Sequence, residues 1–381
     1  MKLSLDILFD VKREPAGCLV LLGAGGEEIA DLYPFLTEVV VDCSREEASV
    51  ATLKFESRRD ENGQWIIQDD DRLATWEWIE IHATFGSSTE EVFRGYIREI
   101  NAEYPENPGA AVVTVECQDE SLKLDREHVR RVWGGDAPTT DQAILAEILT
   151  TRHALAPHPE NASGQSALVL NQDSTDIRFL KERAEANGYE LIFSRGLVYF
   201  GPMRVDAEPQ ATVMVYAGKD SHCLNISVRS DGHQPDKVSF DMPDEDGSGT
   251  TSVTIEPNLT EMGPDSADSS SSGLEEFVWR LPRSTGSNAD ELTARAQERA
   301  NRNSMKIKAE GELDGSLYGH VLRVGEPVPV DGLGQRYSGT YYVDTVRHRF
   351  DTDGYVQSFN LLRNAYGDNI QAGGNVLSAV L

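Results

Sequence analysis

The residues that can do chemistry in this chain form two recognisable patterns, a glycine cluster and a flanked histidine. Gly23–Gly26, with the sequence GAGG, has the glycine content of a phosphate-binding loop, but no Lys-Ser or Lys-Thr pair follows and no GxGxxG frame is present. His348 lies between Arg347 and Arg349 in a strand-like run, and the chain has neither a GxSxG elbow nor an HExxH helix. We therefore interpret the glycine cluster as a turn and His348 as a structural residue.

Carboxylates and thiols define no further site. The chain carries 64 Asp and Glu residues, but their spacing singles out no pair as the two acids of glycoside hydrolysis. Cys18, Cys43, Cys117 and Cys223 show neither CxxC nor Cys/His metal-ligand spacing. We expect buried free thiols, with a disulfide between Cys43 and Cys117 as the alternative. The sequence thus assigns no catalytic, cofactor-binding or metal-ligating residue, and we expect no cofactor.

The charge of the chain limits its partners. Its formal net charge is −29, and binding driven by phosphate neutralisation needs clustered Lys and Arg, so we expect no specific nucleic-acid binding. An acidic surface suits either plain solubility or the wall of a conduit for acidic cargo. The N-terminal sequence MKLSLDILFDVKREP is too polar for a signal peptide, and no apolar run reaches the length of a membrane span. We expect synthesis in the cytoplasm and no membrane insertion.

The elements that must position any site are strands in the first third of the chain. Seven segments there combine β-branched and aromatic residues with flanking turn residues. They are Leu3 to Leu8, Gly17 to Leu22, Leu36 to Cys43, Val50 to Glu56, Thr75 to Ala83, Val92 to Glu103 and Ala110 to Cys117. Ala51, Leu53 and Phe55 alternate with polar neighbours, which gives that strand one face toward a core. Many short strands at this spacing predict a closed or nearly closed barrel.

Two helices are predicted in the middle of the chain. Thr140 can cap the first, whose apolar stripe is Ile144, Leu145, Ile148 and Leu149. The second is expected to run from an N-cap at Ser174, with Asp176 in its first turn, to a stop at Gly188. Its apolar stripe is Ile177, Leu180 and Ala184, and its expected solvent-facing residues are Lys181, Glu182, Arg183 and Glu185. The strands Tyr189 to Phe193 and Leu197 to Phe200 should form a hairpin.

The chain then returns to β structure with an interruption. Leu224, Ile226 and Val228 alternate with polar residues, and Val238 and Phe240 follow in the same pattern. The stretch Pro243 to Glu276 contains no Lys, Arg or His and is rich in Asp, Glu, Ser and Gly, which predicts an exposed, mobile excursion. Asn288 can cap a helix with Ala289, Leu292, Ala296 and Ala300 on one stripe. From Met305 the β pattern resumes.

A hairpin closes this second β region. Gly332 to Arg363 reads GLGQRYSGTYYVDTVRHRFDTDGYVQSFNLLR, with strands Thr340 to Phe350 and Tyr355 to Leu362 around a turn that ends in Gly354. Glycine there supplies the positive φ that a tight reversal needs. Gly339 marks the start of the first strand, where we expect a side chain to crowd the neighbouring backbone.

The order of motifs in this hairpin resembles the last hairpin of baseplate hub proteins of contractile phage tails, the late control protein D family. A second segment, Gln172 to Phe200 (QDSTDIRFLKERAEANGYELIFSRGLVYF), is similar to the helix and hairpin that hub proteins and the related VgrG spike proteins carry between two barrels. The Phe93-Arg94-Gly95 step resembles an element of the first barrel of the family. We interpret Arg94 as a residue that flanks a barrel rim.

The resemblance implies an α+β, mainly β fold with two tube-like β-barrels, a small α+β module between them and a partly helical insertion in the second barrel. The implied ranges are 1–126 for the first barrel, 127–208 for the α+β module, 209–242 with 305–365 for the second barrel, 243–304 for the acidic loop and helix insertion, and 366–381 for a C-terminal tail.

The resemblance also implies a role. A hub is a structural protein without enzymatic activity, located in the tail baseplate of a virion or injection particle, where a homotrimer adapts the hexameric tail tube to the trimeric central spike. Tail tube and spike proteins are the implied partners, together with baseplate wedge and tape-measure proteins. Two alternatives stay open, a β-rich hydrolase of cell-wall glycan and a carbohydrate-binding surface protein. An enzyme should show a pocket with converging titratable groups.

Overall fold

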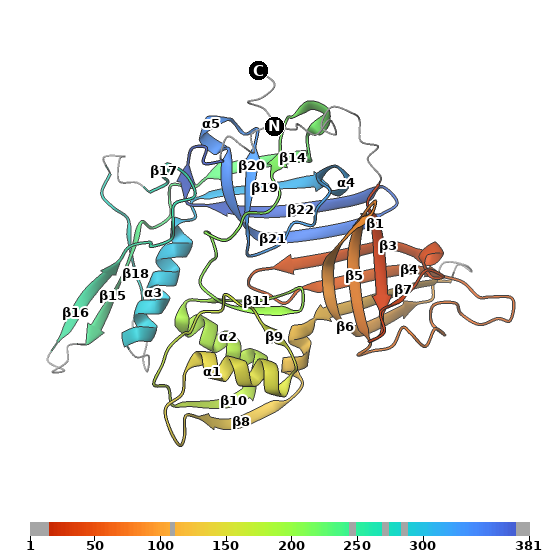
Figure 1. The fold of residues 1–381 in the computed structure, drawn as a ribbon, viewed down its shortest axis with the longest axis horizontal. Coiled ribbons are helices and arrows are strands. Elements are labelled where there is room, and N and C mark those ends of the chain that lie inside the picture. Colours follow the sequence, from red (N-terminus) through yellow and green to blue (C-terminus); the bar gives the residue numbers. More distant parts are fainter. Residues whose placement is uncertain (1–14, 107–110, 244–248, 269–273, 283–288, 371–381) are drawn as a thin grey trace, which may run out of the picture.

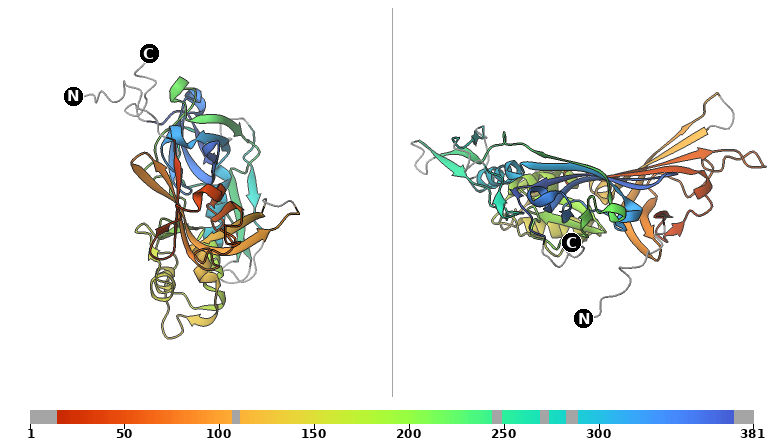
Figure 2. Two further views of the ribbon diagram at one scale, coloured as in Figure 1. Left: turned by 90° about the vertical axis from the view of Figure 1, so that its right-hand side faces the viewer. Right: turned by 90° about the horizontal axis from the view of Figure 1, so that it is seen from above.

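The computed structural model describes residues 15–106, 111–243, 249–268, 274–282 and 289–370. A long sheet crosses the molecule, a module with helices α1 and α2 lies beneath it in Figure 1, and a small sheet with helix α3 lies at the left. Figure 2 shows that the long sheet is twisted, with the small sheet at one end and β4, β6 and β7 at the other. None of the described helices is both long and apolar enough to cross a bilayer.

One half of the long sheet contains the described strands predicted in the first third of the chain, together with the short strand β2, which was not predicted. They are β1 (Gly17–Leu22), β2 (Glu27–Glu28), β3 (Leu36–Ser44), β4 (Val50–Ser57), β5 (Trp78–Phe85), β6 (Ser88–Glu103) and β7 (Ala111–Asp119). Ala51, Leu53 and Phe55 are buried, which confirms the predicted inward face of β4. The predicted strand Leu3 to Leu8 lies outside the described residues. Gly23–Gly26 forms the turn between β1 and β2, as expected.

The other half comes from the C-terminal part of the chain. It contains β13 (Val213–Met214), β14 (Cys223–Ser230), β19 (Ile307–Asp314), β20 (Pro327–Asp331), β21 (Gly339–Asp351) and β22 (Gly354–Arg363), with short helices α4 (Gly315–Tyr318) and α5 (Gly334–Tyr337) between strands. The predicted hairpin is confirmed, since Asp351 pairs with Gly354 and Gly354 has a φ of +125°. Leu224 departs from the predicted alternation and is exposed, because a bulge between Cys223 and Asn225 shifts the register.

Strand β3 joins the two halves. One edge of β3 pairs with β4, and the other pairs with β21 from Ser44–Thr345 to Val39–Phe350. The long sheet therefore has the order β14-β19-β22-β21-β3-β4-β7-β6-β5-β1-β2. The mainly β class is confirmed. Each half of the long sheet corresponds to one of the two expected β domains, and β21 of the second half occupies the β3 edge opposite β4.

The module beneath the sheet contains β8 (His128–Trp133), α1 (Asp141–Ala146), a π-helical continuation (Glu147–Arg152), β9 (Ala156–Pro157), β10 (Leu170–Thr175), α2 (Asp176–Asn187), β11 (Glu190–Ser194) and β12 (Leu197–Gly201). The Thr140 hydroxyl accepts a hydrogen bond from the Ala143 amide at 3.1 Å, which confirms the predicted cap. Gly188 ends α2 with a φ of +65°. The N-cap of α2 is Thr175, one residue beyond the predicted Ser174.

One predicted surface residue of α2 is buried. Arg183 is 5% exposed, and its Nε donates to Oδ1 of Asp141 at 2.7 Å. The prediction of a solvated Arg183 was wrong because its partner lies on α1, 42 residues away along the chain, where no local pattern reveals it. The apolar stripe formed by Ile177, Leu180 and Ala184 is buried as predicted.

The acidic stretch is partly ordered and packed, contrary to the predicted excursion. β15 (Lys237–Pro243) pairs with β16 (Thr250–Ile255) and β18 (Val278–Arg280) in a separate three-stranded sheet, and α3 (Ala289–Ser304) covers one face of it. β17 (Asp265–Ser266) pairs with β23 (Ala365–Tyr366). Met262 is 3% exposed. The composition did not reveal these contacts: β16 pairs with the neighbouring strand β15, whereas β17 and Met262 contact residues near the end of the described chain. The predicted cap Asn288 lies outside the described residues.

Candidate functional site

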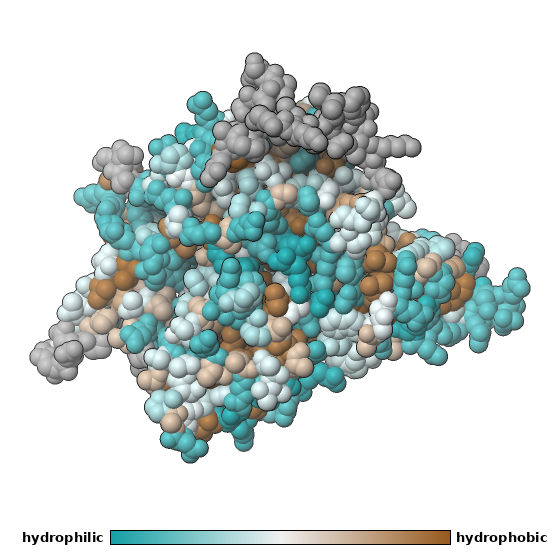
Figure 3. Space-filling view, viewed as in Figure 1, coloured by the Kyte–Doolittle hydropathy of each residue, from teal (hydrophilic) through white to brown (hydrophobic). Residues whose placement is uncertain are grey.

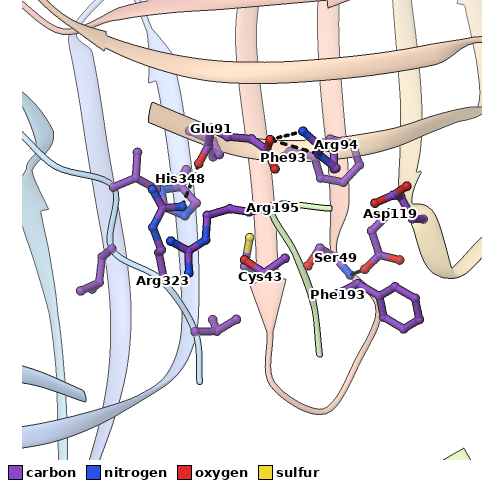
Figure 4. Close-up of a pocket in the computed structure, with 16 residues that line it drawn as sticks. Cys43, Ser49, Glu91, Phe93, Arg94, Asp119, Phe193, Arg195, Arg323 and His348 are labelled. Carbon is purple, nitrogen blue, oxygen red and sulfur yellow. Dashed lines mark hydrogen bonds and ion pairs between the residues drawn. The ribbon is translucent and has the colours of Figure 1, made fainter. Parts of the chain in front are cut away.

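A small cavity lies where the two halves of the long sheet and the α+β module meet (Figure 4). Its lining includes Arg94 on β6, Arg195 in the turn between β11 and β12, Arg323 in the 319–326 loop and His348 on β21. The cavity volume is about 40 Å³. Such a volume accommodates ordered water but not a sugar ring.

Each of the three guanidinium groups at this cavity has a carboxylate partner. The nitrogen–oxygen distances are 2.6 Å for Arg94–Glu91, 3.1 Å for Arg323–Glu90 and 2.7 Å for Arg195–Glu326. The Arg94 pair is drawn in Figure 4. These contacts connect β6, the β11–β12 turn and the 319–326 loop, so the charges hold three segments together. Arg94 lies at the edge between modules, in keeping with its interpretation as a flanking residue.

Two further titratable side chains at the cavity, Asp119 and His348, are buried and make hydrogen bonds. Asp119 accepts hydrogen bonds from the amides of Ser49 at 2.6 Å and Ser121 at 3.0 Å, and burial raises the pKa of its carboxyl. His348 is 1% exposed and its Nδ1 lies 2.8 Å from the Tyr355 hydroxyl. Burial, and then the positive charge of Arg323, lower the pKa of His348 to about 3. His348 is therefore neutral at physiological pH, in a structural role.

A second buried junction ties the α+β module to the long sheet. Arg45, just after β3, donates from Nη1 to Oε1 of Glu190 on β11 at 2.7 Å and from Nη2 to Oδ1 of Asp344 on β21 at 2.9 Å. The Tyr342 hydroxyl donates to the other oxygen of Glu190 at 2.7 Å. Burial disfavours the charged guanidinium, but the carboxylates of Glu190 and Asp344 raise the pKa of Arg45. Sequence reasoning missed this junction because its members belong to three separate modules.

The cysteines and the described acids provide no metal site. All four cysteines are free, so the alternative disulfide between Cys43 and Cys117 is not formed. Burial raises the pKa of the Cys18 and Cys43 thiols to about 12, which keeps both protonated. Within the described ranges, no group of three His, Cys, Asp or Glu side chains could hold a metal ion.

The long sheet also has a polar face. The side chains opposite the core alternate along β21, β22, β19 and β14, and most are exposed or half-buried, whereas Tyr342 and Leu362 are buried. Their contacts run between strands: Nδ2 of Asn225 donates to Glu312 at 2.8 Å, and Nδ2 of Asn360 donates to Thr345 at 2.7 Å. The described 203–205 and 259–262 segments cover the end of this face at Tyr342 and Leu362, and the part around Asn360 and Glu310 is open to solvent and available to line a space.

An open groove of about 1010 Å³ runs along this polar face at the seam between the halves. Its charged lining residues are Asp42, Glu47, Glu310, Glu312 and Arg347. Four carboxylates face one guanidinium, and Nε of Arg347 lies 3.6 Å from Oδ1 of Asp42. The groove is therefore negatively charged and hydrated, a surface that repels other anions.

The comparison with family models matches residues 19–352 of the chain to the model described as the Alg8 N-terminal domain. A search of the curated proteins finds no match.

Solved structures share the fold over nearly the whole chain. A 43 kDa tail protein of prophage MuSo2 from Shewanella oneidensis has 13% identity and a TM-score of 0.67, and the match covers 91% of this chain and 98% of that protein. A tail protein from Neisseria meningitidis has 12% identity and a TM-score of 0.60, with 92% and 97% covered. An Escherichia coli component of the type VI secretion system, described as structurally similar to T4 bacteriophage tail proteins, has 11% identity and a TM-score of 0.54, with 87% and 75% covered. The fold expected from the hub resemblance is thus the fold of phage tail proteins and their secretion-system relatives.

Proposed function

The chain belongs to the Alg8 N-terminal domain family. From the fold that it shares with phage tail proteins, we propose that it is the structural baseplate hub of a contractile tail or a phage-tail-like injection particle. The observation that carries the proposal is the extent of the shared fold, which covers 91% of this chain and 98% of a prophage tail protein. The protein is made in the bacterial cytoplasm and works in the assembled baseplate.

The hub forms a homotrimer. Each chain supplies two β halves, so three copies place six such halves around one axis. A ring of this kind matches a hexameric tail tube on one side and a trimeric central spike on the other. Tube and spike proteins are the direct partners, and wedge and tape-measure proteins contact the periphery and the channel. Residues 1–126 and the ranges 209–242 and 305–365 are the ring-forming units in this proposal.

The polar face of the long sheet lines the central channel. This orientation is supported by the strand-to-strand hydrogen bonds of its side chains and by the carboxylate-rich groove around Glu310 and Glu312. A hydrated, negatively charged wall lets DNA or an acidic protein pass without binding to it. The chain acts without catalysis.

The test is the mass of the purified protein in solution, alone and mixed with the tube and spike proteins encoded beside it. We expect the mass of three chains. If the protein alone is monomeric, we expect the trimer to form when the tube and spike proteins are added. Native mass spectrometry and light scattering measure it. A stable dimer or tetramer that persists in the presence of tube and spike proteins would contradict the hub.

A further inference from the structure

The two halves of the long sheet repeat one strand order. The first half has the order β3-β4-β7-β6-β5 and the second has β14-β19-β22-β21-β20, and every neighbouring pair is antiparallel. Bulges fall at matching places, at Thr37 of β3 and Leu224 of β14, and at Arg98 of β6 and Asp344 of β21. The bulges align the halves residue by residue, so that β14 corresponds to β3 and β6 corresponds to β21.

The seam inside the chain uses one edge from each half. β20 pairs with the start of β21, residues 339–342, and β3 pairs with residues 345–350 further along the same edge. β6 is divided in the same way, because β5 pairs with it only as far as Tyr96. Among the described residues, no strand pairs with this edge of β6 at residues 98–103, and none pairs with the outer edge of β14. The edges that form the seam therefore have counterparts that are free.

Burial differs between the seam and the free edges as a missing partner would explain. The seam residues that face the core are all buried, namely Val39, Val41, Val346 and His348. Their counterparts on the free edges are half-buried, namely Ile226, Val228, Ile100 and Ala102. A strand added to each free edge would cover these side chains as β3 and β21 cover one another.

Tyr104, just after β6, is the most exposed residue of this kind. Its counterpart Phe350 is 6% exposed and packs across the seam, in the core of the first half. Tyr104 is 58% exposed, although its ring packs edge-on against Trp65. In Figure 3 apolar surface is visible at the right, over strands of this half, among hydrophilic side chains. An exposed aromatic ring at the end of an unpaired edge is typical of a residue that a partner covers.

We propose that the free edge of β6 in one copy of the chain pairs with β14 of a second copy, antiparallel and in the register of the β21–β3 seam. That register sets three pairs opposite one another: Asn101 and Arg229, Glu103 and Ser227, Tyr104 and Ile226. The partner is a second copy because β14 and β6 of one chain are separated by β19, β22, β21, β3, β4 and β7, which span roughly 30 Å. Since the joined edges differ, the contact repeats from copy to copy and closes a ring. The number of copies, three, rests on the proposed hub.

The charges along the two edges favour this register around Arg229. At the seam, the corresponding residues Arg347 and Asp42 lie 3.6 Å apart, from Nε to Oδ1. In the contact between copies, Arg229 lies opposite Asn101, with carboxylates two residues away on either side, at Glu99 and Glu103. Lys308 on β19 pairs with Arg229 and adds a second cation, whereas Glu310 lies beside Ser227. The attraction is therefore centred on Arg229 and Lys308.

The experiment is disulfide cross-linking of the full chain that carries Glu103→Cys and Ser227→Cys together. Opposed residues of antiparallel strands have Cα atoms about 4.5–5.5 Å apart, within the reach of a disulfide. The matched control is Glu99→Cys with Ser227→Cys, the same pair of changes at exposed positions four residues out of register, about 13 Å along the strand.

Each variant is oxidised mildly, alone and with the tube and spike proteins, and is then separated in denaturant without reductant. The wild-type chain, whose four cysteines are free, sets the background. We expect linked chains from the Glu103→Cys and Ser227→Cys pair at about tenfold or more over the control pair, and no more than background from either single variant. Circular dichroism confirms that each variant is folded.

Native mass spectrometry of the same samples separates this proposal from the hub. A trimer in which both cysteine pairs link equally, or neither links, overturns the strand pairing and leaves the hub trimer in place. Linking by Ser227→Cys alone means that two β14 edges meet, which also overturns it. Specific linking of the in-register pair in a particle of another copy number supports the strand pairing and contradicts the hub. A chain that stays monomeric with its partners present overturns both.

Discussion

At the scale of single residues, Arg363 shows how this fold satisfies a buried charge without a carboxylate. The side chain is 0% exposed. Its guanidinium donates to the backbone carbonyls of Met262, Ser338, Tyr337 and Gly367, and it lies 5.2 Å from the centre of the Tyr341 ring. Burial lowers the pKa of Arg363. Through these hydrogen bonds Arg363, at the end of β22, connects the hairpin to the 259–268 segment and to Gly367.

Gly339 is the position where this arrangement leaves no room. A Cβ there would lie 2.2 Å from Nη2 of Arg363, and the φ of +139° disfavours any side chain. The obstacle is thus a side chain, where the sequence analysis expected neighbouring backbone. We expect Gly339→Ala to lower the free energy of unfolding by about 2–4 kcal/mol, combining backbone strain with overpacking.

The matched control for this substitution is Gly354→Ala. Its φ of +125° is similar, but nothing lies within 4 Å of a Cβ built there, so only strain of about 1–2 kcal/mol applies. Denaturant unfolding of both variants measures the difference. Equal losses would show that Arg363 shifts freely and does not constrain Gly339.

Asp176 gives a prediction in pH. Burial opposes its charged form, but hydrogen bonds from His153 at 2.7 Å and Gln172 at 2.7 Å, with the charge of Arg152, hold the pKa of this carboxyl below its usual range. A lowered folded-state pKa gives stability that is present above the unfolded-state pKa of about 3.9 and is lost as the pH falls through the folded-state value. We expect Asp176→Asn to cost about 1–3 kcal/mol near neutral pH and progressively less below about pH 4.

Thermal unfolding of the wild type and the variant across this pH range tests the prediction. Glu182→Gln serves as the control, because Glu182 lies on the same helix and is exposed. A difference between wild type and Asp176→Asn that stays constant from neutral pH to pH 3 would mean that Asp176 contributes no pH-dependent stability.

At the scale of elements, local patterns predicted most strands and both helices of the α+β module. The alternation in β4, the Thr140 cap and the Gly354 reversal all depend on neighbours within a few residues, and these predictions were confirmed. The failures share a cause. Arg183 is buried, and part of the acidic stretch is packed, because of contacts with segments that are distant in sequence. The sequence did not predict the cavity or the Arg45 junction for the same reason, because the residues that form them come from separate modules.

The composition of the acidic stretch predicts that its deletion is tolerated, whereas its packing predicts that deletion destabilises the protein. Deleting residues 249–268 removes β16 and both bonds that Arg363 makes to the Met262 carbonyl. A buried donor left without its acceptor costs about 1–3 kcal/mol, and more when charged. We expect the deletion to reduce the yield of soluble folded protein, measured by size-exclusion chromatography.

Arg363→Met provides the control for the deletion, since it removes the charge that needs those carbonyls. In that background the deletion should cost less stability than in the wild type. A deletion variant that is as stable as the full chain would show that this stretch does not contribute to the stability of the fold.

At the scale of the whole molecule, the Arg45 junction decides whether the α+β module is rigidly held. Both side chains of the Arg45–Glu190 pair are under 10% exposed. Breaking such a pair from one side leaves an uncompensated buried charge at a cost of about 3–5 kcal/mol. We expect Arg45→Met to destabilise the protein by this amount and the double variant Arg45→Met with Glu190→Gln to recover part of the loss.

A double-mutant cycle in denaturant measures this coupling. Hydrogen exchange locates it, because loosening should appear in β11 and in the neighbouring end of β3. Additive losses from the two single variants would show that the pair does not couple the module to the sheet.

The pairing of β3 with β21 has a mechanical consequence. The response of a sheet to force depends on the direction of pull. Tension along β3 and β21 loads all the residue pairs from Ser44–Thr345 to Val39–Phe350 together, in shear, whereas a pull across the strands would break them one after another. Because each half of the sheet contributes one strand to this seam, the two halves transmit a load along these strands as a single plate.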